Sequence, residues 1–133
     1  MSHLAPEQLV ELRGRLDAER LRLLERQASE EAEVAAEDPR GDIQDKASDE
    51  ARRTTAMQRH DQGEGRLQEV DAALQRMDAG TYGICEETDE PIPYGRLQIE
   101  PTTRYTVEAL EMLEQERIRD DNMAHGADDR EAY

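Results

Sequence analysis

Four positions of this chain have the spacing of a zinc site but only one of them carries a metal-binding side chain. Cys85 and Thr88 have the spacing of one C-x2-C pair, and Thr106 and Ala109 have that of a second. A structural zinc ion needs four soft or borderline ligands in a tetrahedron. One thiol, two hydroxyls and a methyl group do not supply them. We therefore expect a degenerate zinc-finger-like module without metal, in which Cys85, Thr88, Thr106 and Ala109 form a packed or hydrogen-bonded cluster.

Other metal or redox chemistry has little support in the sequence. His3, His60 and His125 are scattered, and no second ligand pair brings them together. Cys85 has no lysine or arginine within several residues to lower its pKa and no second thiol to resolve an oxidised sulfur, which disfavours a redox sensor. We expect no metal and no cofactor.

Composition limits the fold and the partners. Hydrophobic residues make up 35% of the 133 positions, charged residues make up 38%, and Phe and Trp are absent, which favours long helices over a large core. A net charge of −16 argues against direct binding of DNA or RNA and indicates a protein partner. We expect a cytoplasmic monomer without a membrane span, since no stretch approaches about 18 apolar residues.

The first 77 residues predict an antiparallel coiled-coil hairpin. From Pro6 to about Ala36 leucines recur at heptad spacing, and arginines interleave with glutamates as pairs on the helix surface. Pro39 and Gly41 stop this helix, and a second runs from about Ile43 to Met77. Its tip is expected near residues 38–47. The apolar positions of the two arms are Leu9, Leu12, Leu16 and Leu23, and Leu67, Val70, Leu74 and Met77.

Residues 78–121 predict a small globular domain. Its turn-rich first part suggests short strands or knuckles around a minor core, and a final helix is expected to open at Pro101-Thr102-Thr103. The apolar residues available are Ile84, Ile92, Tyr94, Leu97 and Ile99. Residues 122–133 are acidic and rich in small side chains, so we expect a disordered tail. The fold class is mainly α.

Four features follow one another along the chain: a heptad hairpin, an Asp-x-x-Asp-x-Ala tip, a Tyr-Gly-x-Cys segment and an Arg-Leu-x-x-x-Pro-Thr segment. The last three read Asp42-Ile43-Gln44-Asp45-Lys46-Ala47, Tyr82-Gly83-Ile84-Cys85 and Arg96-Leu97-Gln98-Ile99-Glu100-Pro101-Thr102. The order of these features resembles the DksA/TraR family of RNA polymerase-binding transcription factors. The resemblance runs from about Gln8 to Gln115. The family includes members with degenerate zinc ligands.

The resemblance implies a regulator that is not an enzyme. Its globular part would dock at the rim of the secondary channel of bacterial RNA polymerase, and its hairpin would bring Asp42, Asp45 and Ala47 near the catalytic centre. It would suppress unstable open complexes at ribosomal RNA promoters and activate amino-acid biosynthesis promoters, as in the stringent response. Family members that use guanosine tetraphosphate (ppGpp) carry basic residues where this chain has Glu69, Glu100 and Leu110, which counts against cooperation with that nucleotide. Cooperation stays open as an alternative, because Arg66, Arg76 and Arg104 are nearby basic residues.

Three other interpretations of these features stay open. Asp42 and Asp45 also suit helix capping, as the N-cap and N3 residues of the second helix. The leucine pattern alone would fit a generic coiled-coil adaptor. Paired carboxylates at the tip could also bind Mg²⁺, as in a transcript-cleavage factor of the Gre type.

Overall fold

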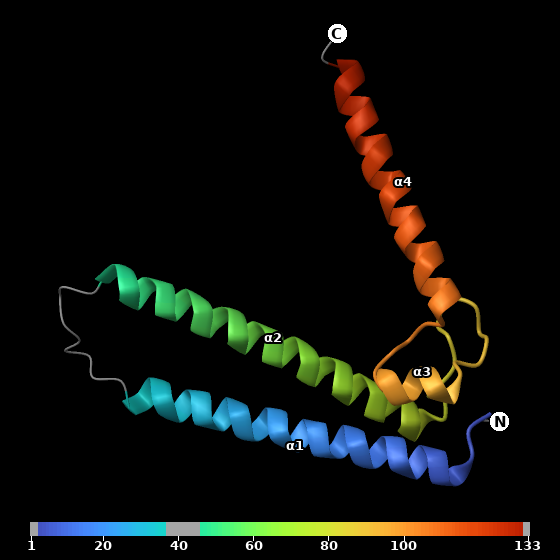
Figure 1. The fold of residues 1–133 in the computed structure, drawn as a ribbon, viewed down its shortest axis with the longest axis horizontal. Helices are drawn as coiled ribbons and strands as arrows, with labels where there is room; N and C mark the ends of the chain where they lie inside the picture. Colours follow the sequence, from blue (N-terminus) through green and yellow to red (C-terminus); the bar gives the residue numbers. More distant parts are fainter. Residues whose placement is uncertain (1–2, 37–45, 132–133) are drawn as a thin grey trace.

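Two long helices form an antiparallel hairpin in the computed structural model, which describes residues 3–36 and 46–131 of the chain (Figure 1). Helix α1 spans Pro6–Ala36 and helix α2 spans Lys46–Ala79. Pro6 occupies a first-turn position that needs no backbone N–H, and Gln8 turns back to accept a 2.9 Å hydrogen bond from the Ala5 N–H. The predicted hairpin is confirmed, while the turn predicted at Pro39 and Gly41 lies outside the described residues.

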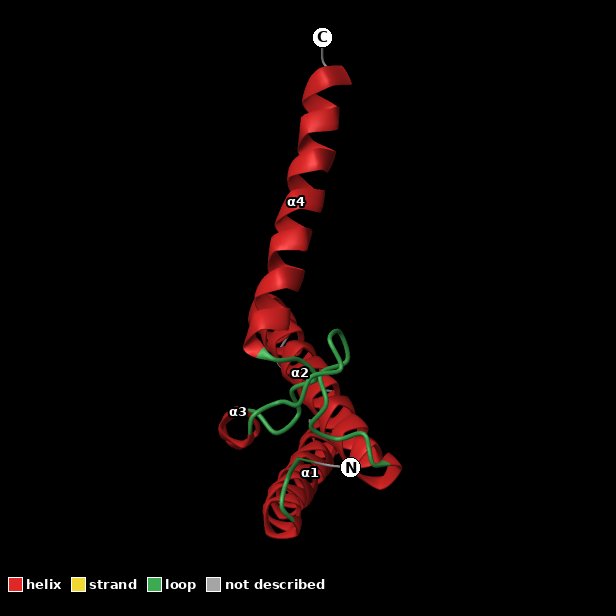
Figure 2. Ribbon diagram, turned by 90° about the vertical axis from the view of Figure 1, so that its right-hand side faces the viewer, coloured by secondary structure: helices red, strands yellow, loops and turns green. Residues whose placement is uncertain are grey.

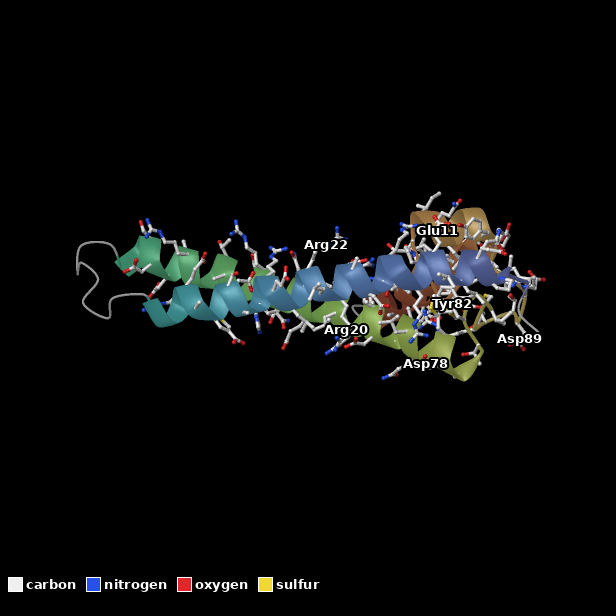
Figure 3. The ribbon with its side chains drawn as sticks, turned by 90° about the horizontal axis from the view of Figure 1, so that it is seen from below. Glu11, Arg20, Arg22, Asp78, Tyr82 and Asp89 are labelled. Carbon is white, nitrogen blue, oxygen red and sulfur yellow. The ribbon has the colours of Figure 1, made fainter. Side chains whose placement is uncertain are left out.

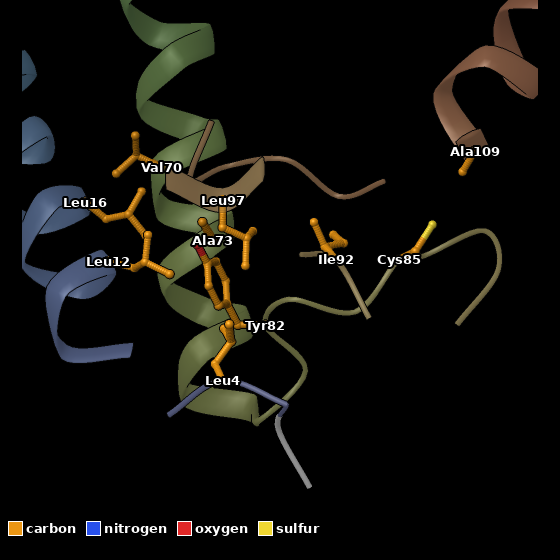
Figure 4. Packing of buried hydrophobic residues seen from close by; sticks show 10 residues of the cluster. All are labelled: Leu4, Leu12, Leu16, Val70, Ala73, Tyr82, Cys85, Ile92, Leu97 and Ala109. Carbon is orange, nitrogen blue, oxygen red and sulfur yellow. The ribbon is translucent and has the colours of Figure 1, made fainter. Parts of the chain in front are cut away.

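The hydrophobic core lies at the base of the hairpin, where the two arms meet the globular module (Figure 4). Leu12 and Leu16 of α1 and Val70 and Ala73 of α2 are fully buried. Of the other predicted heptad positions, Leu9, Leu23, Leu74 and Met77 are partly buried against this core, and Leu67 is partly buried outside it. The heptad prediction is therefore confirmed at these core positions, although it missed Ala73, which is fully buried in the same core.

The module between α2 and the last helix contains one isolated bridge and a short helix. Ile84 pairs with Pro91 in an antiparallel bridge, and helix α3 spans Tyr94–Ile99. We predicted short strands or knuckles here, and helix α3 is a correction to that prediction. Pro93 precedes α3 with φ of −59° and its carbonyl accepts the first hydrogen bonds of the helix, so the proline starts a helix. Leu97 faces the core at 0% exposure, whereas the predicted core residue Ile99 is 79% exposed.

Helix α4 spans Val107–Glu131 and projects away from the module (Figure 2). It begins later than the predicted Pro101-Thr102-Thr103, because the Thr106 hydroxyl accepts a 3.2 Å hydrogen bond from the Ala109 N–H and so caps the helix at residue 106. The helix also continues through residues 122–131, for which we predicted disorder. No proline interrupts this stretch, and its alanine, glutamate, methionine and arginine residues favour helix. None of the described helices combines the length and apolar character that crossing a membrane requires.

Candidate functional site

The chain around Cys85 forms a tight knuckle held by its own backbone. The Cys85 N–H donates to the Glu90 carbonyl at 2.8 Å, and the Asp89 N–H donates to the Cys85 carbonyl at 2.9 Å. The Ile92 N–H closes the loop by donating to Gly83 at 2.7 Å. Asp89 adopts a φ of 59°, a left-handed conformation that aspartate tolerates in turns. The knuckle therefore has a fixed shape that depends on backbone hydrogen bonds.

Three of the four degenerate ligand positions meet in the interior. Cys85 and Ala109 are fully buried, and Thr106 is 4% exposed. The Thr106 hydroxyl donates to the Cys85 sulfur at 3.9 Å while it accepts the Ala109 N–H. Thr88 lies at the exposed surface, where its hydroxyl accepts a weak 3.4 Å bond from the Glu90 N–H. Thr106 thus contributes a hydroxyl that caps α4, and Ala109 contributes a buried methyl group.

The sulfur of Cys85 is surrounded by hydrogen-bond donors. Burial raises the pKa of the Cys85 thiol, but hydrogen bonds from the Thr88 hydroxyl and from the backbone of Thr106, Thr88 and Glu87 outweigh it and lower the pKa to about 7. These donors stabilise negative charge on the sulfur, so the lowered pKa does not depend on a neighbouring cation. The lack of basic neighbours in the sequence gave no indication of this lowered pKa, because its cause is hydrogen bonding.

The cluster does not fit a zinc ion. The side chains at the four positions offer one sulfur, two hydroxyl oxygens and a methyl group, and a tetrahedral zinc site needs four sulfur, imidazole or carboxylate ligands. Across residues 3–36 and 46–131 no group of three or more His, Cys, Asp or Glu side chains converges to hold a metal. Packing and hydrogen bonds hold this module together in the part of the chain that the structure describes.

Arg66 joins both arms of the hairpin to the module. Its Nε and Nη2 atoms donate to the carboxylate of Glu19 on α1, the second bond at 3.0 Å. Its Nη1 atom donates to Glu100 at 2.9 Å and to the Thr102 hydroxyl at 3.1 Å, and lies 3.3 Å from Glu69. The hydrogen bond to Glu19 is the largest cause that raises the pKa of Arg66; burial opposes it, and Glu100 adds to it.

The segment after α3 is held against α2 and the residues that follow α2 by two further hydrogen bonds. The buried Tyr82 hydroxyl donates to the Pro101 carbonyl at 2.8 Å, and burial raises the pKa of Tyr82 to about 12. Arg76 donates to the Thr102 carbonyl at 3.1 Å. Burial and the nearby Arg104 lower the pKa of Arg76. The Tyr-Gly-x-Cys and Pro-Thr segments of the sequence therefore come together at the root of the hairpin.

The ion pairs of α1 run mainly between helices, contrary to the surface pairing within α1 that we predicted. Arg13 binds Asp78 and Arg20 binds Asp71, both on α2, and Glu19 receives Arg66. Figure 3 shows Arg20 and Asp78 among the charged side chains along the arms. Among the described ion pairs of α1, Arg26–Glu30 alone has the i,i+4 spacing. The antiparallel arrangement brings α2 carboxylates within reach of the arginines.

The predicted tip falls largely outside the described part of the chain. Asp42 and Asp45 lie outside the described residues. Ala47 belongs to the first turn of α2, and its side chain is likewise outside the description. Their assignment to the tip, and the capping role of the two aspartates, stay predictions.

Comparisons with known proteins agree with this architecture. Residues 80–115 match the family model described as "Prokaryotic dksA/traR C4-type zinc finger". Over 82 residues the chain is 40% identical to the RNA polymerase-binding transcription factor DksA of Caulobacter vibrioides; the match covers 61% of this chain and 58% of that protein. The chain thus spans a little over half the length of that curated relative.

Two solved structures are similar over most of the chain. The transcription factor DksA2 from Pseudomonas aeruginosa matches with a TM-score of 0.80 and 31% identity, over 86% of this chain and 89% of that one. The RNA polymerase binding protein and transcriptional regulator Dks from Chlamydia trachomatis matches with a TM-score of 0.50 and 20% identity, over 84% and 93%. The second likeness bears on the fold alone.

Proposed function

Because the chain belongs to the DksA/TraR family, we propose that it is a transcription regulator that binds bacterial RNA polymerase. The observation that carries this proposal is the pairing of a two-helix hairpin with a globular module, which matches DksA2 over 86% of the chain. The protein acts by binding, as a monomer in the cytoplasm, and catalyses no reaction of its own.

The proposed mode of action is insertion of the hairpin into the secondary channel. The base is ordered by the Leu12, Leu16, Val70 and Ala73 core, so the module fixes the direction of both arms. The tip carries the acidic residues Asp42 and Asp45. There they would change the stability of open complexes, suppressing ribosomal RNA promoters and activating amino-acid biosynthesis promoters.

We also propose that this activity does not depend on zinc. The Cys85, Thr106 and Ala109 cluster is buried, hydrogen-bonded and closed by a helix cap, which supports a module that folds without an ion. A regulator built in this way would keep working when zinc is scarce.

Acidic side chains at the base of the hairpin count against cooperation with guanosine tetraphosphate. The three carboxylates of Glu19, Glu69 and Glu100 surround the guanidinium of Arg66. Arg76 and Arg104 are further cations near this surface. Hydrogen bonds from Thr102 and Arg66 outweigh burial and lower the pKa of Glu100, which keeps it ionised at neutral pH. The guanidinium of Arg66 is already paired with Glu19 and Glu100, and we propose that transcription effects do not require the nucleotide at this surface.

The deciding experiment is binding to RNA polymerase core enzyme. The purified protein should bind the core enzyme, a second secondary-channel factor should compete with it, and the complex should not cleave the transcript of a backtracked elongation complex. Binding that the competitor leaves unchanged would favour a generic coiled-coil adaptor. Cleavage of the transcript would favour a Gre-type factor. Absence of binding would reject the proposal.

A further inference from the structure

The segment that precedes α1, residues 3–5, lies across the module. Leu4 is 6% exposed and belongs to the same core as Tyr82 and Leu97 (Figure 4). His3 contacts the Ile92 carbonyl through Nε2 at 2.6 Å. A carbonyl can only accept, so Nε2 carries the proton of this hydrogen bond. A side chain and a hydrogen bond therefore tie the segment to the module from a sequence distance of 89 residues.

The module is shaped to receive this segment at Gly83. A Cβ atom at Gly83 would lie 3.1 Å from His3 Cε1 and 3.2 Å from Leu4 Cδ1, which is closer than most real contacts of a Cβ. Gly83 also has a φ of +82°. Glycine is thus needed here for its backbone conformation and for the close approach of residues 3–4.

The segment also closes the loop that carries Cys85. The Gly83 carbonyl accepts the Ile92 N–H, and the Ile92 carbonyl accepts a hydrogen bond from His3. Residues 3–4 therefore contact both ends of the loop from residue 83 to residue 92. Cys85 lies within this loop and is fully buried. In a zinc finger the ion would join this loop to the second ligand pair. In this chain the Thr106 hydroxyl contacts the Cys85 sulfur across the cluster at 3.9 Å, which is long for a hydrogen bond.

We propose that residues 3–5 form a strap that closes the module in place of a metal ion, so that release of the strap opens the loop and exposes Cys85. The strap continues directly into α1, which begins at Pro6. Its closure therefore also fixes the base of α1 to the module. The device is independent of the proposed partner.

The reaction of Cys85 with iodoacetamide under native conditions tests the strap, since this is the sole cysteine of the chain. Leu4→Ala should raise the labelling rate roughly tenfold or more, because it removes a buried side chain from the closed state. The matched control is Leu23→Ala in α1, which removes a partly buried leucine of the hairpin. When the two variants are compared under conditions in which their free energies of unfolding are equal, Cys85 should be labelled more slowly in Leu23→Ala than in Leu4→Ala. Equal labelling rates in these two variants would overturn the proposal.

A second comparison separates the strap from backbone strain. Gly83→Ala and Gly80→Ala both place a side chain on a residue with positive φ, at +82° and +76°, but a Cβ at Gly80 meets nothing within 4 Å. In a His3→Ala and Leu4→Ala background, the effect of Gly83→Ala on the unfolding equilibrium constant should shrink by about fivefold, while that of Gly80→Ala stays the same. Full additivity of Gly83→Ala with the strap variants would contradict the proposal.

Addition of zinc gives a third test of the strap. Equimolar zinc chloride should not slow the labelling of the Leu4→Ala variant. If zinc restores protection of Cys85, then an ion closes the module and the strap does not.

Discussion

Arg66 on α2 and Glu19 on α1 form a two-point ion pair, in which Nε and Nη2 donate to the two oxygens of one carboxylate. The side chains are 27% and 24% exposed, so both charges are largely removed from water. The remaining Nη1 atom of Arg66 reaches Glu100 beyond α3. One guanidinium therefore ties together three segments that lie far apart in the sequence.

Removing this guanidinium should destabilise the fold measurably. We expect Arg66→Leu to lower the free energy of unfolding by about 2 kcal/mol, because it leaves the Glu19 and Glu100 carboxylates without their main partner. The measurement is urea unfolding followed by circular dichroism. Arg20→Leu is the control, since its pair with Asp71 also joins α1 to α2 but is exposed at 46% and 41% and should contribute less than about 1 kcal/mol. Equal losses in the two variants would contradict this prediction.

The stability of the fold should depend on pH through Cys85. Its pKa is lowered from 9.0 to about 7 in the folded chain. A group with a lowered pKa stabilises the fold fully above its unfolded pKa and loses this contribution as pH falls through the folded value. The free energy of unfolding should therefore rise between about pH 7 and pH 9. Cys85→Ser should be flatter over this window, and an unchanged pH profile in that variant would refute the assignment.

Metal removal should leave the protein intact. Elemental analysis of protein purified without a histidine tag should find no zinc, and a strong chelator should not shift the thermal midpoint, because packing and hydrogen bonds hold the Cys85 cluster. The control is a variant with Thr88→Cys, Thr106→Cys and Ala109→Cys, which restores four thiols. It should bind one zinc ion and lose thermal stability on chelation. A chelator-sensitive wild type would show that the module needs an ion.

Helix propensity offers a route to a more stable hairpin. Gly65 is exposed within α2, and an added Cβ there meets nothing within 4 Å. Gly65→Ala should raise the free energy of unfolding by about 0.5–1 kcal/mol, because glycine loses more backbone entropy than alanine in a helix. Thermal unfolding measures the gain. A loss of stability would mean that α2 needs glycine at this position.

The proposed tip can be tested without disturbing the base. Asp45→Asn removes one negative charge and keeps the shape of the side chain, so folding should be almost unchanged while repression of a ribosomal RNA promoter is abolished. In vitro transcription with purified RNA polymerase measures the effect, and binding to the core enzyme serves as the control. Wild-type repression by a variant that still binds would reject the role of Asp45.

Local patterns were sufficient for the two helices of the hairpin. The heptad leucines of α1 place Leu12 and Leu16 in the core, and α1 has the predicted bounds because Pro6 and the helix-forming residues after it act over one or two turns. The module was harder to predict. Short strands or knuckles were expected where Pro93 starts α3, and Ile99 was expected inside although it is 79% exposed. A six-residue helix with few apolar residues has no distinct periodicity from which to predict it.

The sequence by itself determined the two arms, the base core and the lack of zinc ligands, because helix periodicity and ligand chemistry depend on residue type and near spacing. Only the tertiary structure decided that Glu19 meets Arg66, that Tyr82 reaches Pro101, and that Leu4 closes over Gly83. These contacts join residues 19 to 79 positions apart. The packed core aligns the helices and loops, and this alignment decides which distant side chains meet. The spacing of residues along the chain does not specify that alignment.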